Sequence, residues 1–530
     1  MKSNGLSFHH PVLFWFGCAA LVAGVLAHIP MFLMASSDGY RMVGMPMDNT
    51  MLTGMFLIPS GLALAAYGMM PRLARLRGHS HGLAVSFHIA DGAKLNGEHW
   101  KLVSVLLVAL AVDVMKPATL GFVMPGMSHE YAIPKQTAAW LALVALTGTA
   151  LGSVVWGRAA DIYGRRATIL LSALMFMGTA ICGAMPAFSW NLAMCFLMGA
   201  SAGGLLPIAF TLMAEMVPTR HRGWLLVTLG GVGTSAGYLL AAGSAAWLEP
   251  LFSWRSLWLL GLPTGAIIIA LDRFIPESPR FLVEAGLNRE AREVLTKYAG
   301  ELDHDDADQH AATGHHQGFR ALLDGSYTLI TIGLIVCGLA WGLVNFGFLL
   351  WLPSNLTGMG MNAGAASSLL ARSAFLALPG IAIVTWLYHT WSSVKALVLF
   401  ILLCTASLLA YFLLGRFGML DTATIVVATV SLLVSSSGVI AMLIPYAAEI
   451  YPVHLRATGS GVIAASSKFG GILGAIGGVC GLFNDMNLSS LVIALPMAIS
   501  AALLMKRGID TRGRNLEEIQ DAMTAQSAIE

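Results

Sequence analysis

Four ionisable side chains stand well inside long apolar runs of the sequence, where charges are rare. Asp113 and Lys116 share one run, Arg372 lies in a second and Lys468 in a third. If such runs cross a bilayer, each charge near the centre costs at least about 2.5–3.5 kcal/mol on insertion scales, so each needs a chemical reason to be there. Three cations against one carboxylate leave an excess of positive charge, which a bound anion would balance.

The three cations offer an anion different chemistry. Arg372 presents a planar fork of donors, whereas Lys116 and Lys468 are compact point charges. Their depths within the runs allow all three to reach one cavity, so we expect them to bind a small organic anion, a carboxylate or a similar oxyanion. The alternative is that one or more of them extends to the membrane surface or pairs with a backbone carbonyl.

Asp113 is the only acid well inside a run, and it is therefore the candidate for proton coupling. It stands three residues before Lys116 on the same helical face, so a static ion pair is the alternative. Burial and the lysine act on its protonation in opposite directions, so both interpretations stay open. Trp341 and Asn345 are candidates for an apolar and hydrogen-bonding wall of the same site, with simple packing as the alternative.

The composition of the chain indicates that these apolar runs lie in a membrane. Of the 530 residues 57% are hydrophobic and 11% are charged, against about 25% charged in soluble domains. At roughly 20 apolar residues per span, the sequence predicts an all-α polytopic protein with fourteen transmembrane helices. The predicted spans are 12–35, 51–70, 102–124, 137–156, 167–185, 190–214, 223–247, 254–271, 327–352, 365–387, 394–414, 422–446, 457–481 and 488–505.

The distribution of Lys and Arg predicts the orientation. With a cytoplasmic N-terminus, three of the 30 Lys and Arg lie within spans and four on the far side, which leaves 23 in cytoplasmic segments. Cytoplasmic loops carry such an excess, so we expect both termini in the cytoplasm and the protein in the cell membrane. The net charge of +2 gives no reason to expect nucleic acid, and the six scattered cysteines are typical of core residues.

A repeated motif divides the chain. Glu215, Pro218 and Arg222 recur as Glu449, Pro452 and Arg456, each set after the fourth span of a six-span half, which indicates a duplication. Parallel six-helix repeats are typical of secondary transporters. The predicted parts are a two-helix hairpin with a basic link (1–101), a first bundle (102–271), a central loop (272–326), a second bundle (327–505) and a tail (506–530).

The central loop is expected to hold an amphipathic piece near 280–299, followed by a solvated linker. Its segment 303–316 is rich in Asp and His, but no rigid spacing supports a metal site. No cofactor is expected anywhere in the chain. The motif HExxH and paired intramembrane aspartates are lacking, so the sequence does not predict an enzyme.

Three motifs resemble those of the major facilitator superfamily. Gly157–Arg166 is similar to its G-x-x-x-D-x-x-G-R-R motif, while Pro276–Leu282 and Asp510–Ile519 resemble segments of its sugar-porter branch. The resemblance implies two six-helix pseudo-repeats, preceded here by the extra hairpin. It also implies a conformational latch that closes the cytoplasmic side, which we assign to Asp161, Arg165, Glu215, Arg222, Glu449 and Arg456. The loop at Lys395 lacks the second G-R-R copy, so the latch is expected to be asymmetric.

The seventh span of this pattern does not favour a sugar as the substrate, because it has no Gln-Gln pair. Its aromatic residues, and Lys468 before Gly470 and Gly471, resemble the aromatic-acid and nicotinate proton symporters. The sequence therefore predicts a monomeric, proton-coupled symporter of an organic anion that works by rocking-bundle alternating access among membrane lipids. The alternatives are an anion exchanger in which Asp113 is structural, and a nutrient sensor that does not transport.

The N-terminal hairpin is expected to pack outside the bundle and to serve stability or assembly. Its link, 71–101, is basic and suits an anionic inner leaflet, where each cation contributes about 1 kcal/mol. The alternative is that the loop between its two helices folds over the entrance as a lid.

Overall fold

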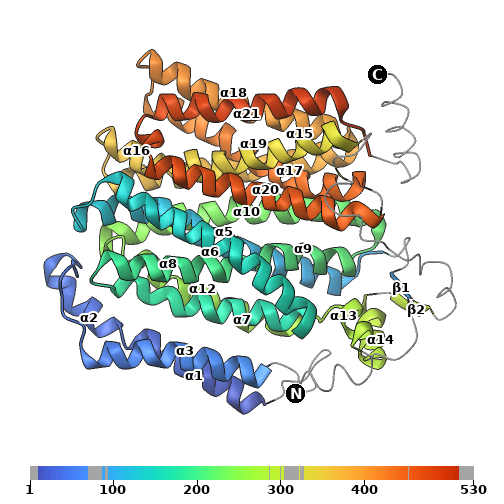
Figure 1. The fold of residues 1–530 in the computed structure, drawn as a ribbon, viewed down its shortest axis with the longest axis horizontal. Coiled ribbons are helices and arrows are strands. Elements are labelled where there is room, and N and C mark those ends of the chain that lie inside the picture. The colour runs from blue at the N-terminus through green and yellow to red at the C-terminus, as the bar shows by residue number, and fades with distance from the viewer. Residues whose placement is uncertain are drawn as a thin grey trace. The chain divides into compact units, whose positions relative to one another are not determined.

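The computed structural model describes residues 10–69, 86–89, 94–285, 287–298, 300–303, 322, 327–451 and 453–511, and these are almost entirely helical (Figure 1). Fourteen helical segments of this part are long and apolar enough to cross a membrane, and each overlaps one predicted span. The all-α, fourteen-span class is therefore confirmed. The segments are Pro11–Asp38, Asn49–Met69, Gly97–Glu130, Lys135–Tyr163, Arg165–Ala184, Phe188–Met216, Arg220–Phe252, Ser256–Phe274, Thr328–Gly358, Ala363–Thr390, Ser393–Arg416, Thr422–Ile450, Thr458–Val479 and Met486–Arg507.

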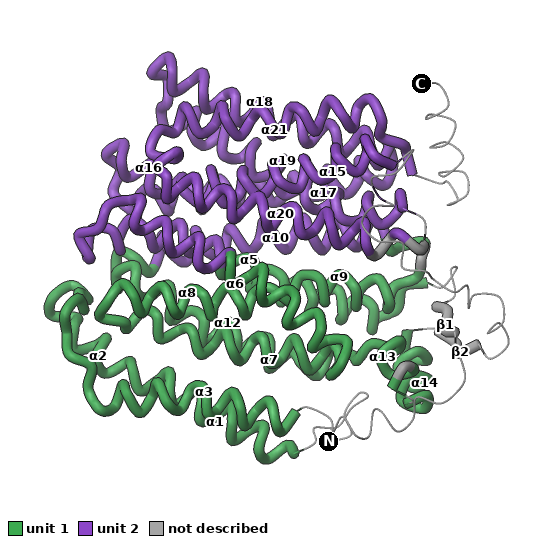
Figure 2. Tube along the Cα trace, in the orientation of Figure 1, with its two compact units in different colours: residues 1–116, 147–222, 248–312 green, residues 117–146, 223–247, 313–530 purple. Residues whose placement is uncertain are grey.

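The chain forms two compact units (Figure 2). Unit 1 comprises 1–116, 147–222 and 248–312, and unit 2 comprises 117–146, 223–247 and 313–530. Three long helices run from one unit into the other: α5 (Gly97–Glu130), α6 (Lys135–Tyr163) and α10 (Thr219–Phe252).

Unit 1 is organised around α7 (Arg165–Gly178), which continues as the 3-10 segment η2. Its span is 94% buried, and it contacts α1, α3, α8, α9 and α12. Apolar residues around the whole helix account for this burial, because a helix that is hydrophobic on all sides belongs in a core. The helical elements of this unit are α1 (Pro11–Leu26), α2 (Ile29–Met34), η1 (Ala35–Asp38), α3 (Asn49–Met69), η2 (Thr179–Ala184), α8 (Phe188–Ala202), α9 (Leu205–Met216), α11 (Ser256–Leu259), α12 (Gly261–Leu271), η3 (Asp272–Phe274), α13 (Pro279–Glu284) and α14 (Asn288–Lys297).

The predicted amphipathic piece of the central loop corresponds to α14, which buries Ala291, Val294 and Leu295 on one face. A feature that the sequence analysis did not anticipate is a two-stranded antiparallel ribbon of β1 (Ser86–Ile89) and β2 (Gly300–Asp303), in which Ser86 is paired with Asp303. The rest of the Asp- and His-rich segment, from residue 304 onward, lies outside the described residues.

Unit 2 packs α15 (Thr328–Leu343) against α20 and α21, and α18 against α19 and α21. After α15 the backbone continues as η6 (Val344–Leu349), which is a π-helix. Such segments are rare and occur frequently at functional sites. The remaining elements are α16 (Leu352–Gly358), α17 (Ala363–Thr390), α18 (Ser393–Arg416), α19 (Thr422–Ile450), α20 (Val453–Val479), η7 (Leu482–Asn484) and α21 (Met486–Arg507).

Glycines hold the N-terminal hairpin together. Gly17 and Gly24 of α1 face Gly61 and Gly54 of α3, and in both helices the glycines are seven residues apart. A Cβ atom on Gly61 would lie 2.6 Å from the carbonyl oxygen of Gly17, so the two backbones touch. Small residues permit this close approach in a membrane, where packing drives helix association.

The hairpin presents two unlike faces. One face packs against α7 in unit 1. The other leaves Phe16 69% and Phe56 72% exposed, as expected of side chains that contact lipid. Its connecting loop is tied to unit 1, because the backbone N–H of Gly44 donates to the carbonyl of Pro186 at 3.4 Å.

We expect Gly61→Leu to lower the melting temperature of the purified protein strongly, because its side chain cannot fit between the touching backbones. Gly243→Ala is the matched control, since a Cβ atom at that position in α10 meets open space. Alanine is the better helix former, so this variant should melt at the same temperature or higher. Equal melting temperatures for Gly61→Leu and the parent protein would contradict the close-packed hairpin.

Candidate functional site

The predicted pair of Asp113 and Lys116 is formed inside unit 1. The Nζ atom of Lys116 lies 3.2 Å from Oδ1 of Asp113, and the lysine side chain is fully buried. Its ammonium also lies 4.1 Å from the centre of the Phe176 ring of α7, a cation–π contact. Since removing one partner of a buried pair costs about 3–5 kcal/mol, each group stabilises the other. A contact of Lys116 with an anion stays a prediction.

Trp341 and Asn345, which were predicted as a wall, converge on one residue of α19. The indole Nε1 of Trp341 donates to the backbone carbonyl of Ser436 at 2.9 Å, and the amide Nδ2 of Asn345 donates to the Ser436 hydroxyl at 2.8 Å. Asn345 Nδ2 also donates to the carbonyl of Trp341 at 3.0 Å. Asn345 belongs to the π-helical segment η6. The sequence analysis did not identify Ser436, which lies in a Ser-rich stretch of its span.

The end of α15 and the π-helical segment η6 pack against the part of α20 that carries Lys468. A Cβ atom on Gly342 would collide with the carbonyl of Ser467, and one on Gly471 would lie 2.7 Å from the Phe346 ring. Lys468 follows Ser467 directly and is half-buried. Unit 2 therefore places the cation of Lys468 on the part of α20 that contacts the π-helical segment η6, which contains Asn345.

Arg372, the remaining predicted cation, lies exposed on α17 in unit 2. Among the described residues of unit 2, no hydrogen bond or ion pair joins it to the cluster of Trp341, Asn345 and Ser436. Its part in anion binding stays a prediction.

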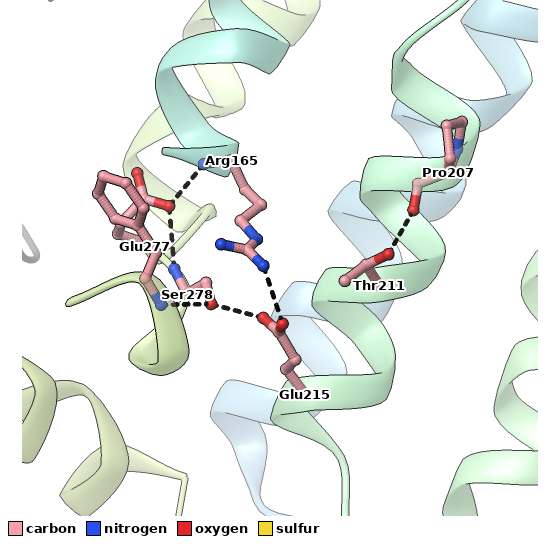
Figure 3. Close-up of polar contacts among 7 residues, drawn as sticks. Arg165, Pro207, Thr211, Glu215, Glu277 and Ser278 are labelled. Carbon is pink, nitrogen blue, oxygen red and sulfur yellow. Dashed lines mark hydrogen bonds and ion pairs between the residues drawn. The ribbon is translucent and has the colours of Figure 1, made fainter. Parts of the chain in front are cut away.

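A second group of polar contacts joins the start of α7, the end of α9 and the segment 277–278 of unit 1 (Figure 3). Nη2 of Arg165, at the start of α7, lies 3.2 Å from Oε1 of Glu215, at the end of α9. The hydroxyl of Ser278 donates to the other carboxylate oxygen of Glu215 at 2.5 Å. Nearby, Arg166 pairs with Asp272 through Nε at 2.6 Å and through a second bond from Nη2. Of the predicted latch, Arg165 and Glu215 are thus in contact.

Glu277 caps the first turn of α7. Its Oε1 accepts from the backbone N–H groups of Arg165 at 2.7 Å and of Ser278 at 3.0 Å. Gly164, just before the helix, has φ +99°, and a Cβ atom there would overlap the Glu277 carboxylate, so glycine is required twice over. Burial raises the pKa of Glu277 to about 7, and the backbone N–H groups of Ser278 and Arg165 oppose this rise.

Unit 2 repeats the arrangement with other groups. Glu449 accepts from the hydroxyls of Tyr388 at 2.9 Å and of Thr511 at 2.6 Å. Asp510 accepts from the backbone N–H of Ser393, at the start of α18, at 3.1 Å. In both units an acid caps a helix start while the next residue, Ser278 or Thr511, binds the glutamate of the repeated motif.

The other predicted latch residues lie at helix ends. Asp161 is exposed near the end of α6, and Arg222 is half-buried in the first turn of α10. The side chain of Arg456 lies outside the described residues. Glu277 and Asp510 were not predicted as caps, although both lie in motifs that resemble those of the family.

Two curated relatives align with most of this chain. The niacin transporter NiaP of Acinetobacter baylyi is 28% identical over 79% of this chain and 96% of its own length. The 4-hydroxybenzoate transporter PcaK of the same organism is 26% identical over 78% of this chain and 92% of its own. The fold is similar to that of a partially occluded, inward-open structure of the xylose transporter XylE from E. coli, with a TM-score of 0.63 and 15% identity over 79% of this chain and all of the other.

The pattern of the Major Facilitator Superfamily matches residues 102–475, from the start of α5 into α20. The chain belongs to this family of transporters. The resemblance predicted from the loop motifs is therefore confirmed. The chain is a multi-pass membrane transporter, and its named relatives are transporters, not enzymes. The hairpin of α1 and α3 precedes the matched region.

The pH dependence of stability should depend on Glu277. Because its pKa is raised from 4.5 to about 7 in the folded protein, the folded chain binds a proton between these values that the unfolded chain lacks, and stability falls as pH rises through this window. Glu277→Gln should remove up to about 3 kcal/mol of this fall. Melting temperatures between pH 4.5 and 8 measure it.

Glu98→Gln is the control for this comparison, since Glu98 is a solvent-accessible acid of the same unit whose side chain is 44% exposed. It should keep the pH slope of the parent protein. The same slope in Glu277→Gln would show that another group carries the titration.

Proposed function

We propose that this protein is a proton-coupled symporter of a small aromatic carboxylate. Niacin and 4-hydroxybenzoate, named for the two relatives, each combine one aromatic ring with one carboxyl group. The proposal extends this substrate class to the present chain. It includes the finer assignments that follow from the sequence: both termini in the cytoplasm, a monomer, and two bundles at 102–271 and 327–505 that rock about the substrate.

The observation that carries the proposal is the cluster at the π-helical segment of unit 2. Trp341 and Asn345 are held by Ser436 and therefore fixed in orientation. The rings of Trp341 and Phe346 lie 6.3 Å apart at right angles, an edge arrangement typical of aromatic packing. Lys468 supplies the cation for the carboxylate, and the Asn345 amide oxygen can accept from a polar substituent on the ring.

Proton coupling is assigned to Asp113. A proton on this carboxylate removes the negative partner of the buried Lys116 ammonium, 3.2 Å away, so the two protonation states differ in local charge. A ligand can shift a conformational equilibrium only through such a difference between states. We assign the latch to Asp161, Arg165, Glu215, Arg222, Glu449 and Arg456, with Arg372 and Lys116 as further substrate cations.

One observation favours the alternative, an anion exchanger. Lys116 is fully buried, paired with Asp113 and packed on Phe176. Such a pair can be purely structural. In an exchanger, a counter-anion on the opposite side would drive uptake in place of a pH gradient.

Lys468→Gln should weaken binding of nicotinate or 4-hydroxybenzoate at least about tenfold, since a charged hydrogen bond contributes about 1.5–3 kcal/mol. Equilibrium binding to the purified protein measures this. Arg416→Gln, at the end of α18, is the control and should bind like the parent protein. Unchanged affinity in Lys468→Gln would exclude this lysine as the carboxylate partner.

Asp113→Asn should abolish accumulation driven by a pH gradient in proteoliposomes while exchange of internal for external substrate continues. The neutral amide resembles the protonated carboxyl group and cannot change its charge state, so proton coupling is lost while substrate binding is kept. If the parent protein accumulates substrate only with an internal counter-anion, whatever the pH gradient, it is an exchanger and the symport proposal fails.

A further inference from the structure

Methionine is concentrated between the two helices of the N-terminal hairpin. The chain has 28 methionines among 530 residues, and seven of them fall in the 25 residues from 31 to 55. Several belong to one hydrophobic cluster of unit 1 that also includes α7. Ordinary packing would use leucine as readily, so this concentration of thioether groups calls for another explanation.

His28, the residue directly before α2, is buried in the same region with 1% of its surface exposed. Its Nδ1 lies 2.9 Å from the carbonyl oxygen of Gly24. Because a carbonyl can only accept, Nδ1 carries the hydrogen and Nε2 presents its lone pair. That Nε2 is buried and has no hydrogen-bond partner in the described part of the chain. A ring with one nitrogen bound to a carbonyl and the other open is the arrangement of a metal-ligating histidine.

Methionines occur on both elements next to His28, α2 and α3. Met31 follows His28 by three residues, about one helical turn. On α3, Gly54 faces the ring, since a Cβ atom there would lie 2.8 Å from Cε1 of His28. Met51 stands one turn before Gly54 and Met55 directly after it. Met31 and Met51 are both buried.

The connecting loop adds two further methionines. Met42 is fully buried and belongs to the same cluster, against which Met45 is packed. The backbone N–H of Met45 donates to the carbonyl of Met42 at 3.2 Å, so a turn holds these two residues together. The loop is thus folded onto the hairpin end that contains His28.

We propose that His28 and the thioethers of Met31, Met42, Met45, Met51 and Met55 form a binding site for a soft monovalent metal ion, Cu(I) in the cell, with Ag(I) as a redox-stable probe. Thioether and imidazole ligands select Cu(I) over hard divalent cations. The carboxylate of Asp48 accepts from the backbone N–H of Met51 at 2.8 Å and supplies negative charge at the same end. The site lies in the hairpin and is independent of the proposed substrate.

The full-length protein in a Cys480→Ser background, which removes the one exposed thiol, provides the test. Cu(I) is titrated against the chromophoric chelator bicinchoninate, and Ag(I) uptake is counted by elemental analysis. We expect one ion per chain. The double variant Met42→Leu with Met51→Leu, and separately His28→Phe, should bind at least tenfold more weakly.

Leucine has a volume close to that of methionine, so the double variant should keep its melting temperature without metal and isolate the loss of sulfur. Met505→Leu, an exposed position on α21, is the matched control and should bind like the parent protein. If the parent protein takes no Cu(I) from the chelator, or the double variant binds as well as the parent, the site does not exist and the methionines only pack. Substrate transport is not the readout, so either result leaves the proposed function untouched.

Discussion

Polar groups that folding buries away from water must find their partners inside the protein, and this constraint accounts for many of the interactions described above. Helices satisfy their own backbones except at the ends, where the first N–H groups have no partner within the helix. The helix α7, buried along almost its whole length, cannot rely on water for this. Glu277 supplies the missing acceptor from a segment more than 100 residues away. The cost is a buried carboxyl group, whose pKa rises accordingly.

The two units solve this problem in the same order along the chain. Glu277 and Ser278 in unit 1 correspond to Asp510 and Thr511 in unit 2, each following the last helix of its half. In unit 1 Glu277 caps the start of α7 and Ser278 binds Glu215. In unit 2 Asp510 caps the start of α18 and Thr511 binds Glu449. The repeat seen in the sequence is therefore also a repeat of capping geometry.

The sequence alone predicted all fourteen spans, since a long apolar run leaves little choice of structure. It also predicted the contact of Asp113 with Lys116, because three residues along a helix is a local distance. It did not predict Ser436 as the partner of Asn345, nor Glu277 as a cap. Those contacts join residues about 90 and 110 positions apart, and no local period encodes them. The π-helical segment at Val344–Leu349 has no sequence signal of its own beyond the glycines that it packs against.

The N-terminal hairpin follows a different packing rule from the family fold to which it is attached. Its two helices meet backbone to backbone through glycines seven residues apart, and the region matched to the family begins only at residue 102. Helices in such close contact leave no room between them for a ligand. Polar chemistry is then left to the end of the hairpin, where α1 gives way to the connecting loop. His28 and the buried methionines lie at that end, so the close packing of the hairpin itself determines where a second site can form.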